Sequence, residues 1–518
     1  MTADQEPSRR HATRRSLILS LVTLTIAMTR NIVLVPVYLD YISIELYGAW
    51  LATGASLAGL IVSDFGLAGV IGQRTAKACG ARDMAEVGRA IGTGLFASGV
   101  VSVAMTVLAV AVAPMLSMIL HLEGSDASLV TQCFMIVALA CGGAVIGLSC
   151  GTVLRSLQRP TAPGLAEVTA ELTALCVTFL LLLRGWGLMA LPLGLAARST
   201  CLLVVNCSVL AWVCRRRLGI GVRIQFSIAK TRWLWRDSWY QFIASMAMRL
   251  QISAQPLLVG AVLGASAAAV FGITQCAVAN ANLLVGRLGG AFLPSFTHLF
   301  GEGSIERCRE VLRQFLSANA LLASVLMGGI LAFNQEFVSL WVGSGLYGGD
   351  LLTALLILCA VSDAFMGASY SAVTAGGGFR LIARAMVISA STQVAITLGL
   401  LTFGLWGAAA GALVASVLRL WLLGRYARMT LSSFDLSTAR RGHAVRETLR
   451  LLAPGMCLGI VVALSDVAAI ESWQDFVMGT VGFVVLVSGM SWLTGKRQIV
   501  FIMSRGESGV RHASGGTT

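Results

Sequence analysis

The sequence has few charged residues. Asp, Glu, Lys and Arg make up 12% of its 518 residues, about half the share found in soluble domains, while 57% of the residues are hydrophobic. Hydrophobic stretches of roughly 20 residues recur from end to end, and each can cross a hydrocarbon core about 30 Å thick. With a mean hydropathy of +0.82, the chain is predicted to be an all-α polytopic membrane protein with almost no soluble mass.

Motifs for catalysis and metal binding are also absent. The twelve cysteines form no C-x-x-C pair and the five histidines are far apart, so no zinc-ligand spacing exists. The glycine run at 376–378 lacks the G-x-x-x-x-G-K-[ST] spacing of a nucleotide-binding loop. No Ser-His-Asp arrangement is evident. We therefore expect that the protein is not an enzyme and that it binds no metal and no cofactor. The net charge of +14 follows the loops, so we expect no nucleic-acid partner.

Lys and Arg are concentrated in every second gap between the hydrophobic stretches. Thirty-two of the 38 lie there, Arg184 lies in an intervening gap, and five lie inside the stretches. Because cytoplasmic loops carry an excess of Lys and Arg, both termini are predicted to be cytoplasmic. The other gaps are short and acidic. Fourteen spans are expected, at 16–39, 46–68, 91–120, 129–153, 164–183, 187–213, 239–263, 268–296, 314–340, 351–375, 385–403, 406–424, 450–465 and 476–494.

An internal repeat relates the first six spans to the next six. Arg30, Pro36 and Tyr47-Gly48 recur as Arg249, Pro256 and Phe271-Gly272, at offsets of about 219 to 224 residues. Both sets begin on the same side, which predicts two six-helix lobes related by a pseudo-twofold axis along the membrane normal. The expected domains are an N-terminal lobe (1–213), a basic linker (214–238), a C-terminal lobe (239–428), an extra helix pair (429–495) and a tail (496–518).

Five arginines lie inside the predicted spans: Arg30, Arg198, Arg249, Arg287 and Arg419. A charge near the bilayer centre costs about 2.5–3.5 kcal/mol, so these side chains should face water, an acid or an anionic substrate. The repeat predicts that Arg30 and Arg249 face one central space.

Three of these arginines have a second interpretation. Arg198 could pair with an acid of its own lobe. Arg287 and Arg419 lie toward the cytoplasmic ends of their predicted spans, where a long side chain can reach the phosphate headgroups.

Acids inside the spans are fewer. Asp363 is central in the span 351–375 and is a candidate proton or sodium site. Glu167 and Glu171 share one face near the cytoplasmic end of the span 164–183, where they suit an interfacial or arginine-pairing role. Asp64 is expected to cap or brace an inner gate. Asp363, Glu171 and Asp64 are thus the candidates for ion coupling or gating.

Three segments carry a family resemblance, namely VPVYLDYISIELYGAWLATG (35–54), SDFGLAGVIGQRTAKACG (63–80) and FNQEFVSLWVGSGLYGG (333–349). They resemble the Wzx-type polysaccharide flippases of the multidrug/oligosaccharidyl-lipid/polysaccharide exporter superfamily. The resemblance covers the first twelve spans, and two additional C-terminal spans occur in the lipid II flippases of that superfamily.

The resemblance implies two lobes around a V-shaped cavity that opens alternately to each side. It implies a polyprenyl-diphosphate-linked oligosaccharide as cargo, moved to the outer leaflet of the bacterial inner membrane for surface or exopolysaccharide synthesis. Membrane lipids and a polysaccharide polymerase or export machinery are the implied partners. By analogy Arg30, Arg249 and Arg287, with Asn31 beside Arg30, would bind the diphosphate. A proton or sodium gradient and the membrane potential would supply energy.

Three other functions fit the sequence less well. An ion-coupled multidrug antiporter of the same fold would favour acids and aromatic residues in its cavity, whereas the deep charges here are mainly arginines. A glycan polymerase or ligase needs a large outer loop, and the longest outer gap is only about ten residues. A scaffold gives no reason to keep Arg30 and Arg249 inside the membrane.

Overall fold

The computed structural model describes most of the chain as helices. The described residues are 6–55, 67–80, 83–120, 122, 124–157, 159, 161–217, 228–301, 305–432, 441–464, 470 and 472–511. Contacts divide the chain into two compact units, unit 1 (Met1–Gly272) and unit 2 (Ile273–Thr518). The predicted division at the linker 214–238 stays a prediction, as do the predicted lobes.

Unit 1 holds the helices up to α9 and the first residues of α10. These are α1 (Glu6–Tyr41), α2 (Ile44–Trp50), the π-helical turn η2 (Leu51–Ala55), α4 (Leu67–Gly80), α5 (Met84–Ile119), α6 (Gly124–Ser156), α7 (Thr161–Leu183), η3 (Gly187–Met189), α8 (Ala190–Trp212), η4 (Val213–Arg217) and α9 (Ile228–Leu263).

Unit 2 holds the remaining helices. These are α10 (Ala265–Gly301), α11 (Ile305–Val342), η5 (Ser344–Leu346), α12 (Asp350–Ala375), α13 (Phe379–Leu400), η6 (Leu401–Phe403), α14 (Trp406–Ser432), α15 (Arg441–Leu464) and α16 (Trp473–Arg511). Gly264, with φ of 94°, separates α9 from α10, since a positive φ is favourable for glycine alone.

Among the described residues, twelve helices are long and apolar enough to cross a membrane, and each coincides with a predicted span. The helix at Thr448–Leu464 is apolar but shorter, and it matches the expected thirteenth span. Part of the expected span 46–68 falls on residues 56–66, outside the described residues. The chain is therefore a multi-pass membrane protein, and the predicted all-α polytopic fold is confirmed.

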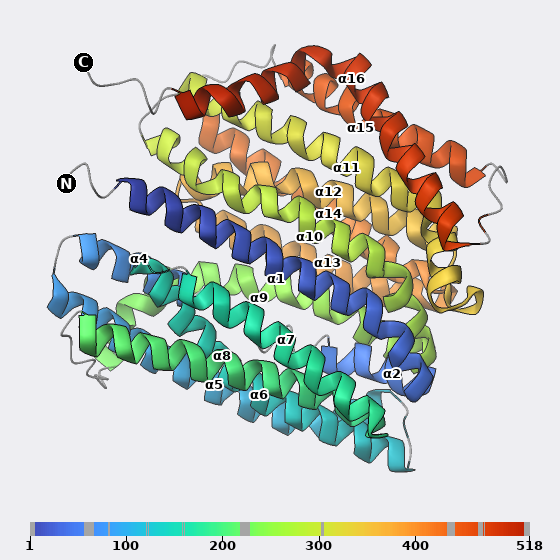
Figure 1. Ribbon diagram of the computed structural model, residues 1–518, viewed down its shortest axis with the longest axis horizontal. Coiled ribbons are helices and arrows are strands. Elements are labelled where there is room, and N and C mark those ends of the chain that lie inside the picture. The colour runs from blue at the N-terminus through green and yellow to red at the C-terminus, as the bar shows by residue number, and fades with distance from the viewer. Residues whose placement is uncertain are drawn as a thin grey trace. The chain divides into compact units, whose positions relative to one another are not determined.

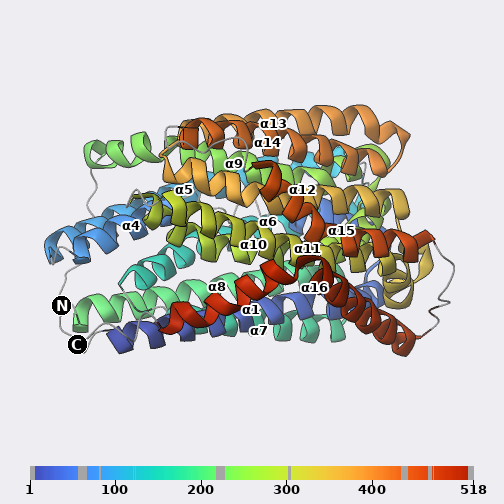
Figure 2. The ribbon, with the colours of Figure 1, turned by 90° about the horizontal axis from the view of Figure 1, so that it is seen from above.

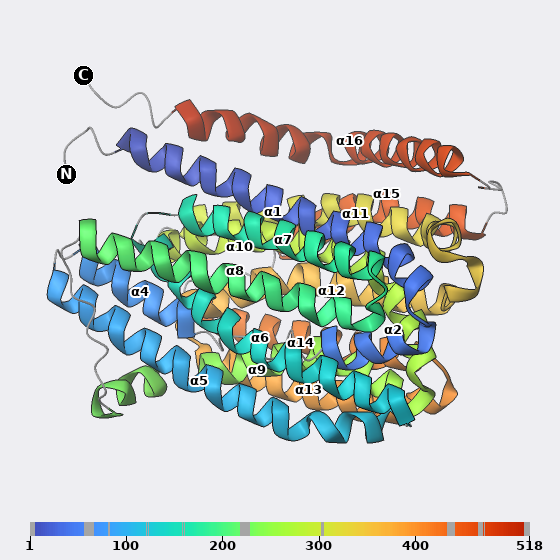
Figure 3. The ribbon, with the colours of Figure 1, turned by 60° about the horizontal axis from the view of Figure 1, so that its bottom comes forward.

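Close helix contacts build unit 1. Helix α6 packs against α5 and α8, and α7 lies between α8 and α1 (Figures 1 and 3). A Cβ on Gly147 of α6 would lie 2.9 Å from the backbone nitrogen of Leu203 in α8. The Asn206 side chain of α8 donates to the Gly147 carbonyl at 3.0 Å. Small residues and such polar bonds hold helices together in lipid, where the hydrophobic effect does not.

The same kind of contact fastens the C-terminal helix pair to unit 2. Helix α15 packs along α11, and α16 contacts both (Figure 2). A Cβ on Gly455 would lie 1.9 Å from the Ser324 carbonyl oxygen, and one on Gly459 would lie 2.4 Å from that of Gly328. Helix α15 can therefore approach the α11 backbone only because glycine occupies these positions.

Polar bonds organise the turn between α11 and α12, within the 333–349 segment that carries the family resemblance. Asn334 donates to the Thr274 carbonyl at 3.2 Å and to the Thr353 hydroxyl at 3.1 Å. The Tyr347 hydroxyl donates to Asp350 at 2.8 Å. Burial, reinforced by the Asp350 charge, raises the pKa of Tyr347, which keeps this donor protonated. This segment therefore has a structural role.

Replacing Gly455 by leucine is expected to detach α15 from α11, because the new side chain would meet the Ser324 backbone. Overpacking of this kind costs about 1–3 kcal/mol or more. Thermal unfolding of the purified protein in detergent measures the loss. Gly482→Leu on α16 is the matched control, since a Cβ there meets nothing within 4 Å. Equal melting temperatures for the two variants would contradict this account of the packing.

Candidate functional site

Three ionisable side chains of unit 1 meet in the middle of the membrane spans. Arg30 lies on α1, Glu171 on α7 and Arg198 on α8. Each is 11 or 12 residues from the end of its span that the predicted topology places outside, which is about 17 Å along a helix. Those ends are Tyr41, Leu183 and Gly187. We call Arg30, Glu171 and Arg198 the triad.

Glu171 bridges the two arginines of the triad. Its Oε2 accepts a hydrogen bond from Nη1 of Arg30 at 2.8 Å, and its Oε1 accepts one from Nε of Arg198 at 2.6 Å. The Glu171 side chain is 4% exposed, whereas those of Arg30 and Arg198 are 20% and 26% exposed. The triad has a net charge of +1, so one carboxylate neutralises only half of the arginine charge that it contacts.

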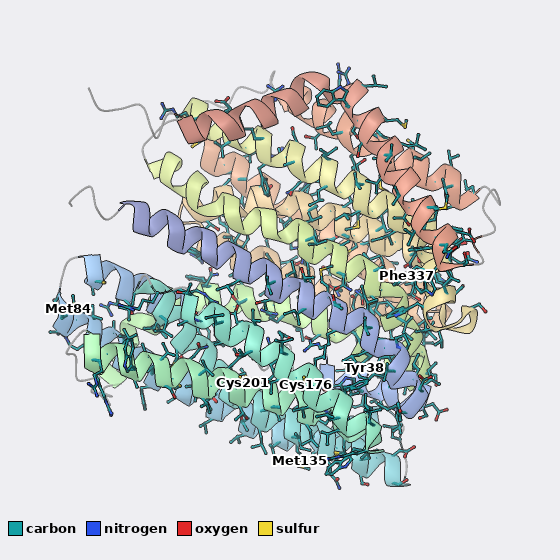
Figure 4. All side chains as sticks on the ribbon, in the orientation of Figure 1. Tyr38, Met84, Met135, Cys176, Cys201 and Phe337 are labelled. Carbon is teal, nitrogen blue, oxygen red and sulfur yellow. The ribbon has the colours of Figure 1, made fainter. Side chains whose placement is uncertain are left out.

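Tight packing of α7 on α8 fixes the Glu171–Arg198 bond. Ala170 of α7 and Leu202 of α8 are both fully buried in one cluster. On the other side of the bond, a Cβ on Gly194 would lie 1.9 Å from the Thr178 hydroxyl. Figure 4 labels Cys176 of α7 and Cys201 of α8, which mark these two helices.

Arg249 is also in the middle of a span of unit 1. It lies 10 residues from Trp239 in the span Trp239–Leu263, about 15 Å along α9. Its side chain is exposed, and no acid of the described part of the chain forms an ion pair with it. An arginine at this depth needs water or an anion from outside the described residues.

Among the described residues of unit 2, one ion pair lies at the centre of the spans. Arg419 of α14 donates through Nη2 to Oδ1 of Asp363 on α12. The Arg419 side chain is 9% exposed. The expectation that Arg419 reaches the headgroups is therefore wrong. Helix α14 continues to Ser432 rather than ending near 424, which leaves Arg419 close to the middle of the helix.

The structure also corrects the predicted depth of Glu171. Because α7 begins at Thr161, Glu171 lies halfway along the helix and not near its cytoplasmic end. The acid-pairing interpretation of Arg198 is confirmed. Glu167, one turn before Glu171, pairs with Arg155 of α6, as the arginine-pairing interpretation expected.

Sequence reasoning missed one relation among the arginines. Arg198 and Arg419 are 221 residues apart, within the offset range of the internal repeat, and each lies on the second helix of a closely packed pair, α6 with α8 and α12 with α14. The repeat offset could have revealed this equivalence. The acids differ, since Glu171 comes from the fifth predicted span and Asp363 from the tenth.

Three of the predicted site residues lie outside what the structure describes. Asp64 falls within residues 56–66, and the side chains of Asn31 and Arg287 are not described. Their predicted roles stay predictions.

Replacing Arg419 by methionine is expected to destabilise unit 2, because it leaves Asp363 as an unpaired charge inside the membrane. Breaking a fully buried pair costs about 3–5 kcal/mol, and the partial exposure of Asp363 lowers the expected cost to about 2 kcal/mol. Thermal unfolding in detergent measures the effect. Adding Asp363→Leu to the same chain should restore most of the lost stability. A double variant no more stable than the single one would contradict a paired role.

Comparison with known proteins identifies the family. The profile of the family described as "Polysaccharide biosynthesis protein" matches residues 59–346, more than half of the chain. The chain belongs to this family. The matched region begins in the second predicted span and ends in the α11–α12 turn, so it includes the triad residues of α7 and α8 and also Arg249. No functionally curated protein matches the chain.

Solved structures share the fold of this family member. The lipid II flippase MurJ, in an inward closed conformation, aligns with a TM-score of 0.65 and 14% identity, over 93% of this chain and 99% of that chain. An inward-facing multidrug resistance MATE family transporter of the MOP superfamily aligns with a TM-score of 0.65 and 15% identity, over 81% and 99%. The chain therefore has the fold of the transporters and flippases of that superfamily, and the predicted resemblance is confirmed at the level of fold and family.

Proposed function

We propose that this protein translocates polyprenyl-diphosphate-linked oligosaccharide from the cytoplasmic to the outer leaflet of a bacterial inner membrane. The observation that carries the proposal is the excess positive charge in the middle of unit 1. Arg30, Arg198 and Arg249 are accompanied there, among the described side chains, by the single acid Glu171, which leaves a net charge of +2. Membership of the polysaccharide biosynthesis family supports the same cargo.

The negative charge of this cargo complements the positive mid-membrane charge of unit 1. A diphosphate linking a polyprenol to a sugar carries two negative charges, and arginine offers paired N–H donors that suit phosphate oxygens. An inside-negative potential of about 100 mV favours outward movement of two negative charges by about 4.6 kcal/mol. The arginines would lower the cost of bringing these charges to mid-membrane, and the potential would favour their release outside.

The alternative, an ion-coupled multidrug antiporter, has support from the fold alone. Organic cations need acids or aromatic faces for binding. The one described mid-membrane acid of unit 1, Glu171, already bonds to two arginines, so this part of unit 1 would repel a cation.

Replacing Arg30 or Arg249 singly by alanine is expected to stop glycan export. Each change removes a mid-membrane cation, while Glu171 keeps Arg198 as a partner in the Arg30 variant. Lipid-linked oligosaccharide should then accumulate on the cytoplasmic leaflet. Its accessibility to an added enzyme or lectin in inside-out and right-side-out vesicles measures the distribution.

Arg184→Ala is the matched control for that experiment, because Arg184 is an exposed arginine outside the membrane spans. It should leave export unchanged. Normal surface glycan in both the Arg30 and Arg249 variants, at wild-type protein level, would overturn the proposed role of these arginines. Export of organic cations by the intact protein would favour the antiporter instead.

We also propose that Asp363 takes part in coupling translocation to a proton or sodium gradient. It lies at mid-membrane and is more exposed than its partner Arg419, so an ion can reach it. A double variant, Asp363→Asn with Arg419→Gln, removes both charges and leaves neither one unpaired. Its translocation in vesicles should lose the response to imposed proton and sodium gradients. A wild-type response would remove Asp363 from the coupling mechanism.

A further inference from the structure

Most hydrogen-bond donors of the triad form no bond to the side chains and backbone that the structure describes. Arginine has five N–H donors, and Arg30 and Arg198 each donate one hydrogen bond to Glu171, through Nη1 and Nε respectively. Neither pair has the two parallel bonds that a guanidinium and a carboxylate can form. Glu171 therefore holds both guanidinium groups while leaving their remaining donors for another anion.

The three side chains of the triad also differ in burial, and the difference favours access of an anion to the arginines. The carboxylate is almost fully buried, at 4% exposed, whereas the two arginine side chains are 20% and 26% exposed. The acid thus lies behind the arginines, and an approaching anion meets the positive groups first. The pair of unit 2 has the opposite gradient, since its arginine, Arg419, is 9% exposed and its acid, Asp363, is 25% exposed.

We infer that Arg198 is a second diphosphate-binding residue, which acts with Arg30 as a clamp positioned by Glu171. This inference rests on the proposed function and extends it to a residue on α8. Both guanidinium groups contact one carboxylate, so they are separated by no more than that carboxylate and two hydrogen bonds. The two phosphoryl groups of a diphosphate share one bridging oxygen, so they also lie close together. One guanidinium can therefore bind each phosphoryl group.

Glu171 is a positioning residue in this clamp. Its bond to Arg198 is fixed by the packing of Ala170, Leu202 and Gly194 between α7 and α8, and its second oxygen places Arg30 of α1 beside them. The same carboxylate repels the bound diphosphate. It therefore limits the affinity of the clamp, which favours release of the cargo.

The clamp can be tested with farnesyl diphosphate, a short prenyl diphosphate, and the purified full-length protein in detergent. Arg198→Ala should weaken binding about tenfold or more, similarly to Arg30→Ala, because each removes charge-assisted hydrogen bonds. Arg198→Lys should recover only part of the affinity, since lysine lacks the planar fork. Farnesyl monophosphate should bind more weakly and respond less to these changes.

Arg155→Ala is the matched control. Arg155 of α6 pairs with Glu167, which lies on α7 as Glu171 does. This variant therefore also removes the arginine partner of an α7 acid. It should bind farnesyl diphosphate as the wild type does. Size-exclusion chromatography and a thermal melt establish whether each variant is folded. If Arg198→Ala does not fold, the affinity of Arg198→Lys still tests the clamp.

Glu171→Gln separates the positioning role from a structural one. Removal of the negative charge should tighten farnesyl diphosphate binding several-fold and slow the release of lipid-linked oligosaccharide to the outer leaflet. Glu167→Gln should change neither quantity. A Glu171→Gln variant that is folded but binds as weakly as Arg198→Ala would overturn the proposed role of Glu171.

The outcomes also distinguish the clamp from the proposed function. Wild-type affinity in folded Arg198→Ala, together with loss of export in the Arg30 and Arg249 variants, would overturn the clamp and leave the flippase in place. Wild-type binding and export in all of these variants would overturn both.

Discussion

A charge inside the hydrocarbon region must have a counter-charge, water or a bound ion, and this constraint organises the middle of the molecule. The cost of an isolated charge there is several kcal/mol, while helices in lipid associate through small residues and polar bonds. The described mid-membrane acids are accordingly paired. Glu171 bonds to Arg30 and Arg198, and Asp363 bonds to Arg419. The described mid-membrane arginines outnumber these acids, and their surplus lies in unit 1.

The two units satisfy the constraint differently. In unit 2 one arginine and one acid neutralise each other, and the arginine is nearly buried. In unit 1 Arg198, which lies at the predicted repeat offset from Arg419, shares its acid with Arg30 and stays partly exposed. An arginine thus lies at this offset on both α8 and α14, while the partner acid comes from α7 in unit 1 and from α12 in unit 2. The two units therefore carry two different electrostatic centres.

The spans could be predicted because hydropathy reports directly on burial in lipid, and all twelve long apolar helices fall on expected spans. Helix ends were less predictable. Hydropathy falls at Arg425 and Arg428, yet α14 continues through both, with Arg425 over the Trp421 ring and Arg428 bonded to the Gly424 carbonyl.

The pairing within the site needed tertiary information. Arg30 and Glu171 are 141 residues apart, and their meeting depends on how α1 and α7 align along their axes. That alignment is set by contacts such as Leu19 against Gly164, which no local pattern encodes. The repeat did contain part of the answer, since the offset between Arg198 and Arg419 marks them as equivalent. The identity of each acid partner could not be derived in this way, because the acids are not equivalent.

The neutral Asp363–Arg419 pair has an electrical consequence. A helix pair that changes position in a membrane field does work only in proportion to the net charge that it displaces. The pair displaces none while no proton or sodium ion is bound to Asp363, so in that state the centre formed by α12 and α14 can shift without sensing the membrane voltage. The triad and Arg249 carry uncompensated charge, and an anion bound there would cancel it. Among the described mid-membrane charges, those of unit 1 would thus respond to the membrane voltage when Asp363 holds no ion, and their response would differ between the empty and loaded forms.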